Sequence, residues 1–346
     1  MSKKKHTIKD VARLAGVSKG TVDRVLHKRG KVSKEAYAKV DKVLKEIEYL
    51  PNPIARNLKN NKIYRICVLI PDSALDSYWL PARQGIKDAS KEFKPFGIIV
   101  DEYLYHPHEK SAFIEKSHEA MSSLPDVLLM APLFQEESLR ILRKCHEENV
   151  RVALFNNYID NVNSEIFIGQ DLYQSGKIAG GLIDKMIGAN SQIAIIHINM
   201  EAHMQLKENG FKSYFDEKND NQNFLEVQNF KTDDISQFNK DVSSFLDQHP
   251  KLSAIFITNS KAHIMVKVLK QNNYEGFVVG YDLLKENIDY LKKGEIDFLI
   301  HQKPKRQAYL GVTYFAEFFL FGKKVPQQKL LPIDIITSEN VDYYLK

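Results

Sequence analysis

The sequence has only two cysteines in 346 residues, Cys67 and Cys145. Two cysteines make neither a disulfide framework nor a paired metal motif, and they are typical of a protein in a reducing compartment. Long apolar runs are missing too: no stretch approaches the roughly 20 apolar residues that a membrane-spanning helix needs. No apolar segment follows the lysines of MSKKKHTIKD, as it would in a signal peptide. We therefore expect a soluble, cytoplasmic protein that binds no membrane.

The chain also lacks the motifs of several large enzyme classes. It has no H-E-x-x-H metalloprotease motif, no Walker-type phosphate loop and no G-x-G-x-x-G dinucleotide loop. Its 11 histidines are scattered without the spacing of metal ligands, and His146 is followed by two glutamates but by no second ligand. The sequence therefore predicts that the protein is not an enzyme and uses no metal or other cofactor.

Charge is distributed unevenly along the chain. Residues 1–62 hold 17 Lys and Arg against 6 Asp and Glu, a net charge of +11, whereas residues 63–346 hold 32 against 38. A compact basic surface gains free energy by displacing counterions from phosphates, so this asymmetry favours a nucleic-acid partner. The alternative is a basic tail that is merely solvated.

Residues 1–50 have the pattern of a small helical domain. Thr7, Ser18 and Ser33 each precede an apolar segment with helical spacing and are suited to cap a helix. Gly16 favours a tight turn between the first two helices. Two helices joined by a short turn and followed by a packing helix form a helix-turn-helix unit.

The segment YLPNPIARNLKNNK predicts one more short helix, within a hinge at 51–62. Asn52 is a suitable N-cap and Pro53 suits a first helical turn, so the helix is expected over 53–58. A helix of this length is not stable alone in water, and we expect it to form only when it is docked.

At matching spacing, TIKDVARLAGVSKGTVDRVL, VS and EYLPNPIARNLK resemble the LacI/GalR family of bacterial transcription regulators. The resemblance implies a homodimer on a palindromic operator in double-stranded DNA, with the second helix in the major groove and the hinge helix in the minor groove. It also implies that Leu58 wedges between base pairs, with Ala55 one turn earlier, and such a wedge kinks DNA. Either a repressor or an activator fits this expectation.

The same resemblance assigns expected DNA contacts. Arg24 matches a base-contacting arginine, and an arginine can bind guanine O6 and N7 with two hydrogen bonds. Ser18 and Thr21 match phosphate contacts, and Lys19 can reach either a base or a phosphate. The full set of expected contacts is Thr7, Ser18, Lys19, Thr21, Asp23, Arg24, Arg29, Lys31, Asn52, Ala55, Arg56 and Leu58.

Two positions of the second helix depart from the family pattern. Gly20 has no side chain where many relatives carry one that contacts a base, so fewer bases are contacted through that turn. Asp23 is a carboxylate on a surface expected to meet DNA. It either pairs with Lys19 one turn earlier, or it accepts a hydrogen bond from cytosine N4 or holds Arg24 or Lys19 in a position to contact a base. The second interpretation makes Asp23 a specificity element.

From Arg65 onward, short apolar runs alternate with segments of helical periodicity, which predicts an α/β fold with parallel sheets covered by helices on both faces. There are too many strands for one small sheet, so we expect two doubly wound lobes with a ligand cleft at the carboxyl ends of the strands. The expected strands are RICVLIP, FGIIVDEY, DVLLMAP, RVALFNN, EIFIG, QIAIIHI, FLEVQNF, AIFITN, FVVGYD, DFLIH and LPIDIIT.

The family resemblance implies an effector domain at 63–346 of the type I periplasmic-binding-protein architecture, whose chain crosses between the lobes three times. The expected lobe boundaries are about 63–168 with 302–329 for the first lobe, and 169–301 with 330–346 for the second.

Polar and aromatic residues near strand ends are the candidates for binding a small molecule. The expected ligand contacts are Tyr78, Trp79, Asn156, Asp171, Gln205, Asn259, Asp282 and Gln302. Amides and carboxylates suit the hydroxyls of a sugar or related polyol, and an aromatic ring can stack on its apolar face. A purine or nucleoside is the alternative ligand, and a sugar-binding transport protein is the alternative function.

Two departures bear on the charge of that ligand. Gln205 matches a position where several relatives have an arginine, and Asn156 with Asn157 replaces an Asp-Arg pair of sugar-binding relatives. We therefore expect a cleft without a pair of opposite charges, and a neutral ligand.

Overall fold

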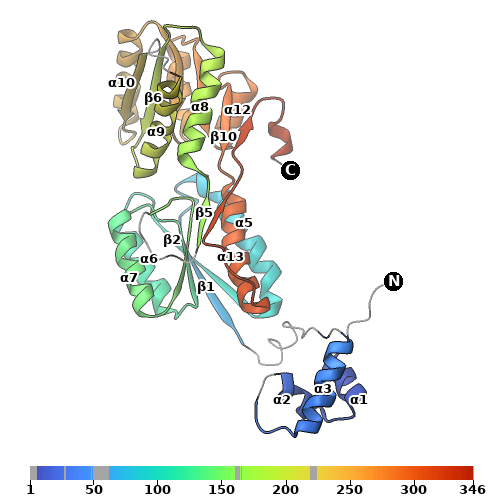
Figure 1. The fold of residues 1–346 in the computed structure, drawn as a ribbon. Coiled ribbons are helices and arrows are strands. Elements are labelled where there is room, and N and C mark those ends of the chain that lie inside the picture. The colour runs from blue at the N-terminus through green and yellow to red at the C-terminus, as the bar shows by residue number, and fades with distance from the viewer. Residues whose placement is uncertain are drawn as a thin grey trace. The chain divides into compact units, whose positions relative to one another are not determined.

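The computed structural model describes residues 6–26, 29–47, 49, 62–159, 164, 166–218 and 224–345. The chain divides into two compact units, Met1–Lys59 and Asn60–Lys346 (Figure 1). The predicted hinge helix lies outside the described residues, and so do its expected DNA contacts Asn52, Ala55, Arg56 and Leu58. No helix of the described ranges is both long and apolar enough to span a bilayer.

The described part of the first unit consists of α1 (Ile8–Ala15), α2 (Lys19–Leu26) and α3 (Lys34–Glu46). The Thr7 hydroxyl accepts a hydrogen bond from the backbone N–H of Asp10 at 3.4 Å, and the Asp10 carboxylate accepts one from the backbone of Thr7 at 2.9 Å. The two bonds form a capping box that fixes the start of α1.

The other predicted caps and the turn are confirmed. Ser18 and Ser33 each accept a hydrogen bond from the backbone N–H three residues later, at 3.1 and 3.2 Å. Gly16 ends α1 with a φ of +65°, a left-handed conformation that glycine adopts without strain. Each helix contributes one fully buried valine to the core: Val11, Val22 and Val40.

In the second unit, a first sheet has the strand order β11-β5-β4-β3-β1-β2, and its strands all pair in parallel. Helices α5 and α13 lie on one face, and α6 and α7 on the other (Figure 1). The strands are β1 (Tyr64–Pro71), β2 (Ile98–Tyr105), β3 (Val127–Met130), β4 (Arg151–Phe155), β5 (Ile166–Gly169) and β11 (Gln328–Leu330). The helices are η1 (Ser77–Trp79), α5 (Leu80–Phe93), η2 (Lys94–Phe96), α6 (Lys110–Ser122), α7 (Gln135–Glu147) and α13 (Pro304–Phe321).

Strand β1 is buried on both sides. Ile66, Val68 and Ile70 belong to the core that includes α5 and α13, whereas Cys67 and Leu69 belong to the core that includes α6 and α7. A strand with apolar neighbours on both faces has no polar alternation, which explains why RICVLIP is an almost continuous apolar run.

A second sheet has the order β12-β10-β9-β8-β6-β7. Its strands are β6 (Gln192–Ile198), β7 (Phe224–Phe230), β8 (Leu252–Ile257), β9 (Phe277–Tyr281), β10 (Phe298–His301) and β12 (Asp334–Ile336). The helices around it are α8 (Leu172–Met186), α9 (Ala202–Glu217), α10 (Ile235–Gln248), α11 (Ala262–Gln271) and α12 (Lys285–Lys292), with η3 (Val341–Tyr343) near the C-terminus.

The chain passes between the two sheets three times: after β5, after β10 and after β11. On the first two crossings a helix follows before the next strand, and it returns the chain to the far end of the sheet. On the third crossing β12 follows directly, so it enters at the cleft end and runs antiparallel to β10. The predicted parallel sheets are confirmed, and β12 is an antiparallel strand at the edge of the second one.

Strand β11 was not expected from the sequence. All three of its residues are exposed, and it lies at the edge of the first sheet, where it pairs with β5 alone. An exposed edge strand of three polar and apolar residues has neither the length nor the alternation that predicts a strand.

Helices α8 and α9 cross at very close range. A Cβ on Gly176 would lie 1.9 Å from the carbonyl oxygen of Lys207, and a Cβ on Gly210 would lie 1.9 Å from that of Tyr173. Only glycine allows this approach of the two backbones. The crossing fixes the position of α9, which contributes residues to the cleft described below.

Candidate functional site

A cavity lies between the lobes, at the carboxyl ends of the strands, with about 510 Å³ of unfilled space including its solvent-filled mouth. The first lobe contributes Asp76, Tyr78, Trp79, Pro107, His108, Leu133, Asn156 and Asn157. The second lobe contributes Glu201, His203, Met204, Lys207, Asn259, Ser260, Lys261 and Asp282, and the second crossing contributes Gln302.

Six of the expected ligand contacts meet in this cavity: Tyr78, Trp79, Asn156, Asn259, Asp282 and Gln302. The other two do not line it. Asp171 is exposed and caps α8 by accepting a hydrogen bond from the backbone N–H of Gln174 at 2.8 Å. Gln205 is exposed on α9 and donates to the side chain of Asn209 at 3.0 Å.

On the wall formed by the first lobe, Tyr78 and Trp79 lie side by side, and Tyr78 is hydrogen-bonded to the side chain of Asn156. Asn156 donates a hydrogen bond from its side chain to the Tyr78 hydroxyl, and burial raises the pKa of Tyr78 well above its usual value, so the phenol stays neutral. Asn156 has a φ of +69°, a left-handed conformation that asparagine tolerates better than most residues. Trp79 is 2% exposed and packs edge-on against Phe155, so little of its ring faces the cavity.

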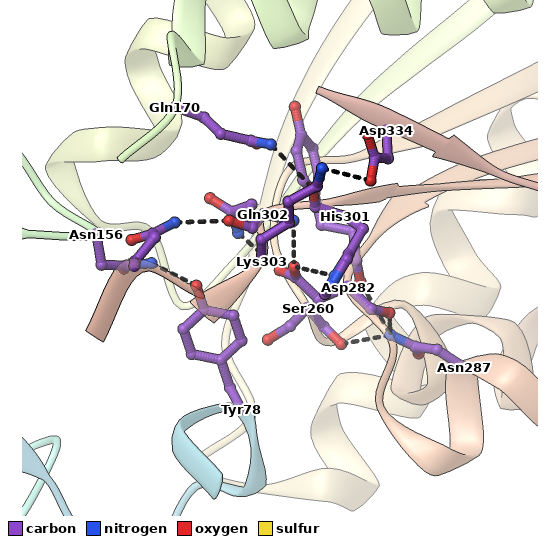
Figure 2. A network of polar contacts seen from close by, with 12 residues as sticks. Tyr78, Asn156, Gln170, Ser260, Asp282, Asn287, His301, Gln302, Lys303 and Asp334 are labelled. Atoms are coloured by element: carbon purple, nitrogen blue, oxygen red, sulfur yellow. Dashed lines mark hydrogen bonds and ion pairs between the residues drawn. The ribbon is translucent and has the colours of Figure 1, made fainter. Parts of the chain in front are cut away.

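On the opposite wall, the Asp282 carboxylate is held by Gln302. The Gln302 backbone N–H donates to Asp282 Oδ1 at 3.0 Å, and its side-chain Nε2 donates to Oδ2 at 2.6 Å (Figure 2). Asp282 is 1% exposed and has a φ of +66°. Each carboxylate oxygen still has a lone pair for another donor, because an ionised carboxylate accepts about four hydrogen bonds.

Lys207 brings a positive charge into the same cavity. Its side chain is fully buried, Nζ donates to the Thr258 carbonyl at 2.9 Å, and the ammonium lies 3.7 Å from the centre of the Tyr281 ring. Burial lowers the pKa of Lys207 to about 8, and the negative charges of Asp282 and Glu201 oppose this shift. The expectation of a cleft without opposite charges is therefore wrong.

Two further ionisable residues of the second lobe lie near the mouth. Burial raises the pKa of Glu201 to about 7, an effect that Lys261 and Lys207 oppose and Asp76 of the facing lobe reinforces. Burial lowers the pKa of His203 to about 3, so this imidazole is neutral at pH 7. The charge at the mouth of the cleft consequently changes near neutral pH through Glu201.

Signals for these residues are present in the sequence. Glu201 follows the end of β6 by three residues. It is therefore a polar residue near a strand end, the same criterion by which Asn259 and Asp282 were predicted. His203 and Lys207 are four residues apart on α9 and therefore share one face of that helix, which Met204 also borders. A lysine on the otherwise buried face of a helix is a candidate binding residue.

Behind this wall, His197 joins a buried hydroxyl to a carboxylate. Its Nδ1 lies 2.8 Å from Thr258 Oγ1, and its Nε2 lies 2.7 Å from Glu208 Oε2. The other carboxylate oxygen of Glu208, Oε1, accepts a hydrogen bond from Lys212. Thr258 is fully buried and is not among the cavity residues. The group therefore supports the wall that carries Lys207. Among the described residues, no group of three His, Cys, Asp or Glu side chains is placed to hold a metal ion.

The first unit presents its own candidate surface on α2. Ser18, Lys19 and Arg24 are exposed, and Arg24 Nε donates to the Gly20 carbonyl at 3.2 Å. A Cβ on Gly20 would lie 3.7 Å from Arg24 Nη2, so the guanidinium lies over the turn where Gly20 has no side chain. Asp23 is partly buried on the same helix. Thr21 is partly buried, while Thr7, Arg29 and Lys31 are exposed.

Comparison with known proteins agrees with both units. Residues 66–324 match the family model described as periplasmic binding protein domain, and residues 7–52 match the model of bacterial regulatory proteins, lacI family. The chain belongs to the periplasmic binding protein domain family and carries an N-terminal lacI-family domain.

Relatives of this family include regulators and binding proteins. The HTH-type transcriptional repressor CytR of Escherichia coli K12 is 26% identical over 204 residues, which are 58% of this chain and 58% of CytR. The regulator RegA of Clostridium saccharobutylicum is 32% identical over 150 residues, 43% of this chain and 42% of RegA. The chain thus aligns with 58% of the length of CytR and 42% of the length of RegA.

Solved structures show the same fold. A LacI transcriptional regulator from Bacteroides fragilis superposes with a TM-score of 0.77 and 26% identity, covering 82% of this chain and 100% of that one. GanP, a glucose-galactose binding protein from Geobacillus stearothermophilus, has a TM-score of 0.70 and 23% identity, covering 81% and 99%. At that identity, the second likeness concerns the fold alone.

Proposed function

We propose that this protein is a cytoplasmic transcriptional regulator that binds a palindromic DNA operator as a homodimer and responds to a small molecule in its interlobe cleft. The observation that carries this proposal is the presence, in one chain, of a lacI-family domain and a periplasmic-binding-protein fold with a polar cavity. A transport protein would need the cavity but not the basic residues 1–62, which disfavours that alternative.

In the proposed complex, α2 lies in the major groove and Arg24 contacts a guanine. Its exposure on α2 supports this role, and the hydrogen bond from its Nε to the Gly20 carbonyl orients the guanidinium. Ser18, Thr21, Arg29 and Lys31 contact phosphates. The hinge contacts Asn52, Ala55, Arg56 and Leu58 stay predictions from the sequence.

For the effector we propose a sugar or a related polyol. Asp282 accepts hydrogen bonds from ligand hydroxyls on one side of the cavity, and Lys207 and Asn156 donate hydrogen bonds to ligand hydroxyl oxygens. The edges of the Tyr78 and Trp79 rings provide apolar contact. The solved proteins that share this fold include one with bound D-arabinose, one with bound myo-inositol and one with bound D-allose. These likenesses support the choice of ligand class.

Regulation requires that the effector bind two states of the protein with different affinity. We propose that a ligand held by both Asn156 of the first lobe and Asp282 of the second favours a closed cleft. The closed cleft then changes the geometry in which two hinge helices meet the operator, and operator affinity changes by the same factor as effector affinity.

A thermal-shift screen of monosaccharides, polyols and purine nucleosides tests the effector part of the proposal. A ligand at about 100 times its Kd stabilises the folded chain by about 2.7 kcal/mol, so its Tm rises. Asp282→Asn keeps the size of the side chain and tolerates the left-handed φ, yet it removes the carboxylate, so the shift should vanish. The matched control Asp171→Asn, at an exposed helix cap, should retain it.

The two outcomes of the screen that contradict the proposal are distinct. A Tm shift with nucleosides alone would replace the polyol by the alternative ligand class and leave the regulator intact. An equal shift in the wild type and Asp282→Asn would place the ligand outside the cleft. For the DNA part, sequences selected from a random duplex pool should share a palindrome, and Arg24→Ala should abolish its enrichment.

A further inference from the structure

One glutamine contacts all three segments that cross between the lobes. Gln170 lies in the first crossing, between β5 and α8, and is 3% exposed. Its side-chain Nε2 donates to the carbonyl of His301 at 2.9 Å and to the carbonyl of Pro332 at 2.9 Å. His301 ends β10, directly before the second crossing, and lies beside Gln170 (Figure 2). Pro332 lies in the third crossing, so a single amide group joins all three.

The orientation of this amide is settled by its partners. Both partners are carbonyl oxygens, which only accept hydrogen bonds, so the NH2 group must face them and both of its protons are used. Rotating the amide by half a turn would place the Gln170 oxygen against two other oxygens. The contact is therefore specific for a side chain with two donors on one atom.

The same crossings hold a second tie. In the second crossing, Lys303 has a φ of +58° and its ammonium lies 2.7 Å from the Asp334 carboxylate, at the start of β12. This pair joins the second crossing to the strand that follows the third. It does not include the first crossing, which the Gln170 side chain joins to both others. The backbone N–H of Leu331, in the third crossing, also donates to the carbonyl of Gly169 at the end of β5, at 2.8 Å.

A short path leads from Gln170 to the cavity. His301, whose carbonyl accepts from Gln170, is followed in the chain by Gln302, which lines the cavity and holds both oxygens of Asp282. The Gln302 carbonyl in turn accepts from Gln307 at the start of α13. A movement of Asp282 is thus transmitted to the crossings through the peptide bond between His301 and Gln302.

The buried polar groups around these crossings are only partly satisfied. The side-chain oxygens of Gln170 and Gln307 and the Nδ1 of His301 have no hydrogen-bond partner among the described residues. Buried polar groups without partners cost free energy, and folded proteins contain few of them. These three atoms lie beside the crossings and are free of competing bonds to the described residues.

We propose that Gln170 is a positioning residue that makes the three crossings move together when the cleft opens and closes. Without it, the first crossing loses its hydrogen bond to the second, and the lobes sample a wider range of angles. The inference rests on the proposed function in one respect: that cleft closure is the response to a ligand. Gln170 itself is not among the residues that line the cavity.

The test measures the distance between the lobes in the full-length protein without any added ligand. Spin labels are attached through Glu115→Cys on α6 and Lys240→Cys on α10, both exposed helix positions, and pulsed electron resonance gives the distance distribution. The native cysteines are both buried, and burial raises the pKa of Cys145 to about 12, so neither competes for the label.

Gln170→Leu keeps the size of the side chain and removes both donors. We expect the distance distribution to become at least twice as wide as in the wild type. Gln170→Asn keeps both donors on a chain one methylene shorter and should give an intermediate width. The matched control Gln174→Leu removes an exposed glutamine of the neighbouring helix and should leave the distribution unchanged.

A lower Tm with an unchanged distance distribution would overturn the proposal, since it would show that Gln170 only stabilises the fold. If Gln170→Leu does not fold, the same comparison is made with Gln170→Asn: a distance distribution as narrow as that of the wild type would overturn the proposal. Because no ligand is added, this result is independent of the effector screen, and the failure of one leaves the other standing.

Discussion

At the scale of single residues, the buried ammonium of Lys207 is the feature with the largest energetic consequence. Burial lowers its pKa from an ordinary value of 10.5 to about 8, so at pH 7 the folded protein keeps a charge that the site disfavours. A shift of this size corresponds to about 3 kcal/mol. The site therefore contributes binding capacity at the expense of stability.

Lys207→Met should accordingly raise the free energy of unfolding at pH 7, by up to about 3 kcal/mol less the lost bond to Thr258, while it abolishes ligand-induced stabilisation. Urea unfolding and the thermal-shift assay measure the two effects. Lys240→Met, which removes an exposed lysine of α10, is the control and should change neither. A less stable variant that still binds the ligand would contradict both assignments.

The same residue makes a prediction about pH. The unfolded chain holds the Lys207 proton up to about pH 10.5, whereas the folded chain releases it near pH 8. Between these values the unfolded state binds more protons, so the contribution of Lys207 to stability rises with pH. The stability advantage of Lys207→Met over the wild type should therefore shrink from pH 8 to pH 10. An advantage that is constant over this range would exclude the shift.

For Asp23, the specificity interpretation predicts that Asp23→Ser raises affinity for random DNA and relaxes operator preference. The carboxylate repels phosphates that no other contact compensates, and its removal weakens that discrimination. The measurement is the ratio of operator to random-DNA affinity at fixed salt. Asp41→Ser on α3 makes the same change of charge and is the control. If both variants keep the wild-type ratio, Asp23 has no role in specificity.

At the scale of elements, the glycine contact between α8 and α9 positions half of the cavity wall. Gly176→Ala places a methyl group 1.9 Å from the Lys207 carbonyl, so the helices must separate, and overpacking of this kind costs about 1–3 kcal/mol. We expect a lower free energy of unfolding and weaker ligand binding, measured by urea unfolding and by titration. Gly188→Ala, where a Cβ would meet nothing within 4 Å, is the control and should be neutral.

How far the sequence predicts an element depends on how local its cause is. The helices of the first unit were predictable because Thr7, Ser18 and Ser33 make capping bonds within one turn. The direction of β12 depends on where the chain re-enters the second sheet after the third crossing, and no local pattern records that. Lys207 was missed because its burial depends on the packing of α9 against α8.

At the scale of the whole molecule, most of the expected ligand contacts line the cavity, but the expectation about its charge was wrong. Six of eight expected contacts meet because the carboxyl ends of parallel strands converge at the crossings. The prediction of the cavity's charge was wrong because it matched Gln205 to a helix position that faces the cleft, whereas Gln205 is exposed. Lys207 lies two residues further along α9, on another side of the helix, and it lines the cavity. Its positive charge reverses the conclusion that the cavity has no pair of opposite charges.

The central claim is that occupation of the cleft changes operator affinity, and one measurement tests it most directly. The Kd of the full-length protein for its selected operator is measured at fixed salt, with and without the ligand found by thermal shift, at about 100 times that ligand's Kd. Coupling between two sites typically amounts to roughly 5-fold to 150-fold, and we predict a change in that range. An operator Kd that stays the same with the cleft saturated would contradict the account.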